Sequence, residues 1–135
     1  MLTVCIDTNV WISGVVFSGK PAEVVTAAFA RKFNLVLSQA ILDELEKNLL
    51  NKFGFSRRNT KILLSRILQI ADLYEPSGAI KVIPNHAMDN LVLETALLGK
   101  AKFLITGDRQ HPLPLRAYRN LKIVDPATFL VQLKK

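Results

Sequence analysis

The stretch Leu2-Thr3-Val4-Cys5-Ile6-Asp7-Thr8-Asn9 joins a short apolar run to a polar segment near the start of the chain. An uninterrupted apolar run of this length is typical of a strand buried on both faces, as strands of parallel sheets are. It predicts a strand over residues 2–6 followed by a polar loop. Asp7 would then stand at the carboxyl end of that strand.

Short apolar runs separated by amphipathic segments continue along the rest of the chain. Further buried strands are predicted over residues 35–37, 80–83, 103–106 and 121–124. Helices are predicted over residues 22–31 and 88–98. Three more are predicted behind N-cap residues: one after Ser38, one from Ser56 to about Leu73, and one that begins at Pro126 after Asp125.

Strands that alternate with helices, without hairpin signals between them, indicate right-handed βαβ units. We therefore predict an α/β fold, an α/β/α sandwich in which helices flank a mostly parallel sheet of about five strands. A chain of 135 residues is long enough for one such domain, spanning residues 1–135. Ligands bind such sheets beyond the carboxyl ends of the strands, where the strand order reverses, so residues that follow strands are candidates for function.

Composition narrows the class of protein. Hydrophobic residues make up 50% of the chain and charged residues 21%, as in a packed globular domain. The apolar runs are too short to cross a bilayer, and the first residues lack the basic start of a signal peptide, so we expect a cytoplasmic protein without membrane contact. The single cysteine, Cys5, lies in an apolar run and is interpreted as a small buried side chain.

The balance of charge points to a polyanionic partner. Eighteen Lys and Arg residues against 11 Asp and Glu residues give a net charge of +7, which attracts nucleic acid. Between Lys47 and Ala71 there are basic residues and no acidic ones. Within that segment Arg57, Arg58 and Lys61 fall in one sector of the predicted helix, where they could contact RNA phosphates or form a solvated face.

One segment has the spacing of a phosphate-binding loop. Gly14-Val15-Val16-Phe17-Ser18-Gly19-Lys20 is followed by Pro21, where that motif needs a Ser or Thr hydroxyl for magnesium. Proline offers neither the hydroxyl nor a backbone N–H. We interpret the segment as a flexible loop before a helix.

Four acidic residues are placed so that they can reach one edge of the predicted sheet. Asp7 and Asp108 end strands, while Asp89 and Glu44 lie early in helices. Each has another interpretation: Asp89 as a helix cap, Asp108 as a turn residue, and Glu44 as one of three exposed acids with Asp43 and Glu46. Helical spacing does not select Glu44 over its two neighbours.

Four short segments in this order resemble the motifs of PIN-domain ribonucleases, most closely the small VapC-like toxin components of prokaryotic toxin–antitoxin systems. They are Asp7-Thr8-Asn9-Val10, Ser38 with Ile41-Leu42-Asp43-Glu44-Leu45, Asp89-Asn90-Leu91-Val92-Leu93-Glu94-Thr95-Ala96, and Thr106-Gly107-Asp108. The resemblance runs along nearly the whole chain.

The resemblance implies a metal-dependent endoribonuclease that hydrolyses RNA phosphodiester bonds with one or two Mg²⁺ or Mn²⁺ ions. By position, the catalytic and metal-binding residues would be Asp7, Glu44, Asp89 and Asp108, supported by Asn9, Thr106 and Ser38, with Arg109 as a further RNA contact. A cognate antitoxin and a homodimer are the implied protein partners. Two departures stand out: His86 occupies a position where many relatives carry an aspartate, and Gln110-His111-Pro112-Leu113 replaces a usual Leu-Leu.

Physical chemistry supports a cation at such a cluster. Two carboxylates 4 Å apart repel by roughly 4 kcal/mol at an effective dielectric constant of 20, so a group of four needs a divalent cation or must stay partly protonated. Oxygen ligands select Mg²⁺ or Mn²⁺. The other seven acidic residues face 18 basic ones, so the surroundings of the cluster carry +11 (18 − 7).

Two other functions compete with this hypothesis. A basic RNA-binding or assembly module would use the same acids only as helix caps and turn residues. A phosphatase with an aspartate nucleophile at a strand end is disfavoured, because Asn9 stands where such enzymes carry a second aspartate.

Overall fold

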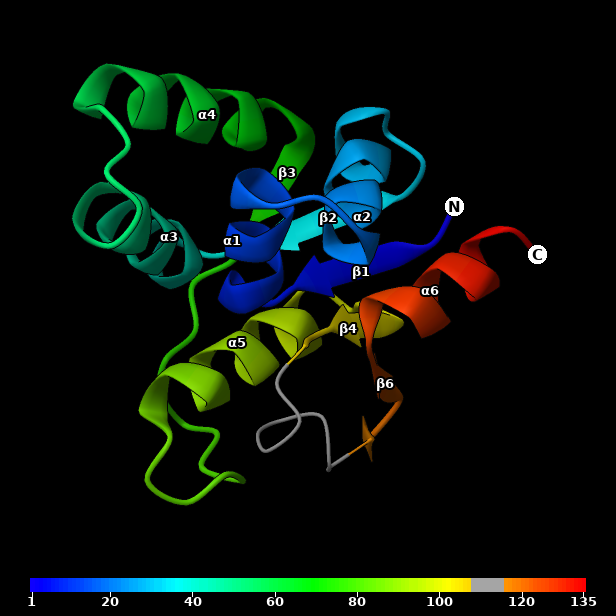
Figure 1. Cartoon of the computed structure of the whole chain (residues 1–135). Helices are drawn as coiled ribbons and strands as arrows, with labels where there is room; N and C mark the ends of the chain where they lie inside the picture. The colour runs from blue at the N-terminus through cyan, green and yellow to red at the C-terminus, as the bar shows by residue number, and fades with distance from the viewer. Residues whose placement is uncertain (108–115) are drawn as a thin grey trace.

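The computed structural model describes residues 1–107 and 116–135. The elements follow one another as β1 (Thr3–Ile6), α1 (Thr8–Val16), α2 (Lys20–Phe29), β2 (Asn34–Leu37), α3 (Gln39–Asn51), α4 (Arg57–Ile70), β3 (Ala71–Leu73), α5 (Ala87–Leu98), β4 (Phe103–Ile105), β5 (Ala117–Tyr118), β6 (Leu121–Val124) and α6 (Pro126–Leu133) (Figure 1).

The strands form one six-stranded sheet in the order β3-β2-β1-β4-β6-β5. Every neighbouring pair is parallel except β5 and β6, which are antiparallel. The predicted α/β fold, with a mostly parallel sheet flanked by helices, is therefore confirmed. The strand order reverses between β1 and β4, which places the expected ligand site beyond the carboxyl ends of those two strands.

Helices cover the sheet from both sides. In Figure 1, α1 and α2 lie above β1 and α5 lies below it. The α5 helix packs against β1, β2 and β4, while α6 packs against α2 and β4. Among the described helices, none combines the length and apolar composition that crossing a bilayer requires.

The first strand lies at the centre of the core, as its apolar sequence predicts. Val4, Cys5 and Ile6 are fully buried, and so is Trp11 at the first turns of α1. Burial raises the pKa of the Cys5 thiol far above its usual range. Cys5 therefore stays neutral and serves as a small core side chain.

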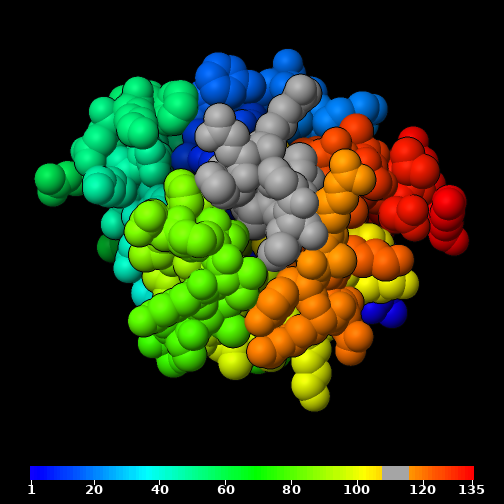
Figure 2. All heavy atoms as spheres, turned by 90° about the horizontal axis from the view of Figure 1, so that it is seen from below, coloured from blue at the N-terminus to red at the C-terminus, as the bar shows by residue number. Residues whose placement is uncertain are grey.

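The prediction of a strand over residues 80–83 is wrong, and the third strand lies earlier in the chain. The α4 helix ends at Ile70, and residues 71–73, predicted to be helical, instead pair in parallel with β2. Residues 80–83 cross the face seen in Figure 2, where the light green segment before α5 lies. There Ile83 N donates to Asn90 Oδ1 at 2.9 Å, and Asn90 Nδ2 donates to Ile83 O at 2.8 Å. A side chain of α5, and not a neighbouring strand, thus bonds the backbone of Ile83.

Two other expectations differ from the structure. Tyr118 and Leu121 pair in an antiparallel hairpin that was not predicted, because its turn contains Arg119 at φ 55° and not the glycine that marks such turns. The polar segment after Asp7 begins α1 directly, and Gly14 lies inside that helix. The segment with the spacing of a phosphate-binding loop is therefore mostly helical.

Gly14 of α1 packs closely against α2. A Cβ at Gly14 would collide with Val25 Cγ2 and would lie 2.7 Å from the backbone oxygen of Pro21. A glycine inside a helix costs about 1 kcal/mol relative to alanine. The close packing of α2 accounts for the glycine at this position.

We expect Gly14→Ala to destabilise the fold by about 1–3 kcal/mol, because the Pro21 carbonyl belongs to the backbone and cannot move away without shifting α2. Urea unfolding would measure the change. Gly107→Ala is the matched control, since a Cβ there meets no atom of the described residues within 4 Å, and it should stay within about 0.5 kcal/mol of the parent. A Gly14→Ala protein as stable as this control would contradict the assignment.

Candidate active site

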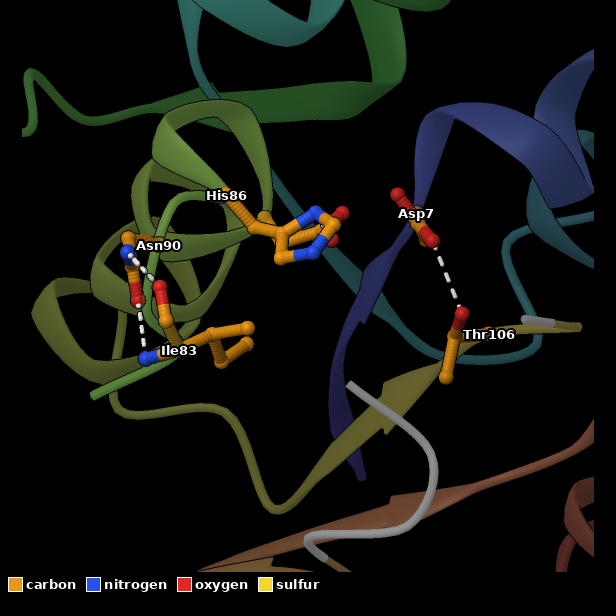
Figure 3. Close-up of polar contacts among 6 residues, drawn as sticks. Asp7, Ile83, His86, Asn90 and Thr106 are labelled. Carbon is orange, nitrogen blue, oxygen red and sulfur yellow. Dashed lines mark hydrogen bonds and ion pairs between the residues drawn. The ribbon is translucent and has the colours of Figure 1, made fainter. Parts of the chain in front are cut away.

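Asp7 lies at the reversal point of the sheet and is held there by the neighbouring strand. Its backbone N–H donates to Ile105 O at 2.9 Å, and Thr106 Oγ1 donates to Asp7 Oδ2 at 2.8 Å (Figure 3). Thr106 in turn donates its backbone N–H to Val124 O at 2.9 Å. Three adjacent strands thus fix a carboxylate that is only 3% exposed.

Glu44 reaches the site from α3, which follows the neighbouring strand β2. Ser38 starts this helix as its N-cap, with Oγ accepting the N–H of Ile41 at 3.4 Å. Glu44 is half-buried, whereas Asp43 and Glu46 are exposed. The structure therefore separates Glu44 from the two acids that helical spacing could not exclude.

Asp89 is the third residue of α5 and its side chain is mostly buried. The N-cap of α5 is His86, so Asp89 is not the helix cap. The two side chains are paired, with His86 Nδ1 3.6 Å from Asp89 Oδ2. In Figure 3 the His86 ring extends from the start of α5 toward Asp7.

The charges of these carboxylates act on one another. Burial raises the pKa of Asp7 from an ordinary value near 4 to about 7, the hydrogen bond from Thr106 opposes this, and the charges of Asp89 and Glu44 add to it. Burial and the charge of Asp89 also raise the pKa of Glu44. Acids from three separate elements therefore repel one another at one edge of the sheet.

Thr8 is a site residue that the sequence analysis did not single out. Its hydroxyl lies near Glu44 and lowers the pKa of that carboxyl. Within the described residues, Thr8 Oγ1 is buried and makes no hydrogen bond of ordinary geometry. Asn9, predicted as a supporting residue, is exposed in the first turn of α1.

Five further residues were predicted to take part in the site or in RNA binding. Asp108 and Arg109 are outside the described residues. Arg57, Arg58 and Lys61 are exposed in the first two turns of α4. This helix packs against α3, the helix that carries Glu44.

The donor set suits a hard divalent cation. Asp7, Glu44, Asp89 and the Thr8 hydroxyl offer only oxygen atoms, and the raised pKa values reflect burial and mutual repulsion, both of which a bound cation would offset. Across residues 1–107 and 116–135, no three Asp, Glu, His or Cys side chains converge closely enough to enclose an ion by themselves. Mg²⁺ retains several waters and uses one or two carboxylates, so these residues fit such an ion without a closed cage.

A buried aspartate at the reversal point of a parallel sheet, with two further acids acting on its pKa, defines a candidate hydrolytic site of the kind found in metal-dependent nucleases. Residues 3–110 match the PIN domain, and the chain therefore belongs to the PIN-domain family, a family of predicted nucleases that generally use a divalent metal. The match runs from β1 to just beyond Asp108 and includes all four candidate acids. Comparison with curated proteins gives no significant match.

The buried Asp7 carboxyl predicts that the metal-free protein becomes less stable as pH rises. The unfolded chain loses this proton near pH 4, whereas the folded chain keeps it until about pH 7. Between these values the folded state binds more protons, so this group should lower the free energy of unfolding by roughly 4 kcal/mol, with no further change above the folded pKa. Urea unfolding at a series of pH values in EDTA measures this.

Asp7→Asn is the control, because the amide does not titrate and its pH dependence should lack this component. A variant with the same pH dependence as the parent would show that Asp7 titrates normally.

Mn²⁺ should stabilise the parent protein most above pH 7, where the carboxylates are deprotonated. At a hundredfold excess over Kd, binding should add about 2.7 kcal/mol to the free energy of unfolding and so raise the melting temperature. A melt that ignores millimolar Mn²⁺ would count against a cation site.

Proposed function

We propose that this chain is a metal-dependent endoribonuclease that hydrolyses RNA phosphodiester bonds, with Asp7, Glu44, Asp89 and Asp108 as its acidic site. The observation that carries the proposal is the almost fully buried Asp7 at the reversal point of the sheet, whose pKa the charges of Asp89 and Glu44 raise further. Burying a carboxylate beside two others is costly, and a fold tolerates that cost where the charge has a use.

The side chains of the proposed site have two roles: Thr106 positions Asp7, and the acids supply negative charge. Thr106 fixes Oδ2 of Asp7 by a hydrogen bond. Asp89 enters from α5 and Glu44 from α3. A bound Mg²⁺ or Mn²⁺ would activate water and stabilise charge on the phosphate, so a protein nucleophile is unnecessary.

The capping interpretation of the acids has less support. Asp7 stands at the N-cap position of α1 but makes no side-chain capping hydrogen bond. Asp125, in contrast, caps α6 by accepting the N–H of Thr128 at 2.8 Å. The chain therefore uses aspartate as a cap in one place and as a buried acid in another.

We further propose a biological role as the toxin of a toxin–antitoxin pair, acting as a homodimer that a cognate antitoxin holds inactive. The support is the resemblance of the four motifs to the small VapC-like proteins. Brief expression in bacteria should stop growth and produce new RNA ends, and Asp7→Asn should do neither. Normal growth together with unchanged RNA ends would contradict the toxin role.

We expect Asp7→Asn to lower RNA cleavage by roughly a hundredfold or more while the protein stays folded, because the amide keeps the shape of the side chain but loses its charge. Cleavage of a labelled RNA by the purified protein in Mn²⁺ measures the effect. Asp43→Asn is the matched control, since Asp43 is exposed and bonded to Gln39 at 2.8 Å. Equal activity of the two variants would overturn the assignment of Asp7.

We also expect the first turns of α4 to contact RNA phosphates. Replacing Arg57, Arg58 and Lys61 together by alanine should weaken RNA binding and reduce the slope of log K against log salt by about 2, since each contact to single-stranded nucleic acid contributes about 0.7. Alanine at the exposed residues Lys32, Lys134 and Lys135 removes the same charge elsewhere and serves as the control. Equal slopes for the two triple variants would identify the α4 residues as a solvated face.

A further inference from the structure

A cavity of about 700 Å³ opens between the segment 78–87 and α5. Its lining is mostly apolar and includes Ile80, Ile83, Pro84 and Leu91. Lys81 lines the same cavity and is exposed. Figure 2 looks onto the face of the molecule on which this segment and the start of α5 lie.

Two buried polar side chains of α5 hold the wall of the cavity in place. Glu94 accepts hydrogen bonds from Ser77 N at 2.6 Å, Ser77 Oγ at 3.0 Å and Gly78 N at 3.0 Å. One turn earlier, Asn90 binds both backbone groups of Ile83 (Figure 3). The segment is therefore fixed to the helix at two points, and the cavity is already formed in the protein without a ligand.

His86 connects this cavity with the acidic site. The residue lines the cavity, and its Nδ1 is 3.6 Å from Asp89 Oδ2. A molecule in the cavity would therefore lie next to a phosphate group held at the carboxylates. The Asn90 amide is bonded to Ile83, and the other polar side chains of the lining are Lys81, Asn85 and His86.

We propose that this cavity binds one unpaired nucleobase of the RNA, next to the phosphate that is cleaved; this inference rests on the proposed nuclease function. Apolar walls and an imidazole ring suit the flat face of a base, and RNA-binding proteins stack unpaired bases on such groups. The volume lies within the usual range for ligand sites. Because a base must leave its helix to enter, the substrate is single-stranded RNA.

Binding of RNA without cleavage tests this inference independently of catalysis. The probes are fluorescein-labelled pentanucleotides of adenosine, cytidine or uridine, titrated in EDTA with the wild-type protein, Ala87→Leu and Ala79→Leu. Ala87 lines the cavity, and Ala79 is an exposed residue of the same segment that does not, so the two substitutions are matched. The larger side chain at residue 87 fills part of the cavity.

We expect the wild-type Kd to differ between the pentanucleotides, and Ala87→Leu to weaken the tightest of them by roughly tenfold while Ala79→Leu leaves all three unchanged. A duplex of the same length should bind less tightly than the single strands. Equal Kd values for the three wild-type complexes, or equal effects of the two substitutions, would overturn the inference.

Cleavage in Mn²⁺ of an RNA with random sequence is the second measurement. Ala87→Leu should change the preferred base beside the cut, whereas a merely structural defect would slow all cuts equally and count against the cavity. If the wild-type protein binds the pentanucleotides with base preference but cuts no RNA, the nuclease proposal fails and the base site stands.

Discussion

The burial of one carboxylate, that of Asp7, is the constraint on which the rest of the site depends. The central strand β1 ends inside the protein, and its last neighbours are backbone groups of β4 and the hydroxyl of Thr106. One hydrogen bond from a neutral hydroxyl does not compensate for the lost hydration of a charge, so the pKa of Asp7 rises to about 7. The two further acids that face it, Glu44 and Asp89, make a positive ligand the natural complement of the site.

Much of this fold could be predicted from the sequence, because parallel strands buried on both faces are continuous apolar runs. The same rule failed for residues 80–83, which are apolar except for Lys81 but line a cavity, and the backbone of Ile83 is bonded by the Asn90 side chain. It also missed β3, where Asp72 interrupts the apolar pattern of a short edge strand. Apolar sequence indicates burial, and only the pairing partner decides whether the buried segment is a strand.

The candidate site was predictable in part, for a related reason. Residues that follow strands, such as Asp7 and Thr106, are placed by the sheet itself, so topology alone brings them together. The choice of Glu44 over Asp43 depends on how α3 is rotated against α1, which a single helical pattern does not specify. Thr8, Asn90 and Glu94 were missed as such; a signal was present in α5, where Asn90 and Glu94 are polar, four residues apart and buried.

The hydrogen bond between Thr106 and Asp7 joins residues 99 positions apart, and this separation has a consequence for how the protein is made. During synthesis Asp7 leaves the ribosome first and stays without its partner until β4 has followed, when most of the chain has emerged. Contacts of such long range form late in folding. The contact that fixes Asp7 is therefore completed only when nearly all of the chain has been made, so the candidate site cannot assemble on a short nascent chain.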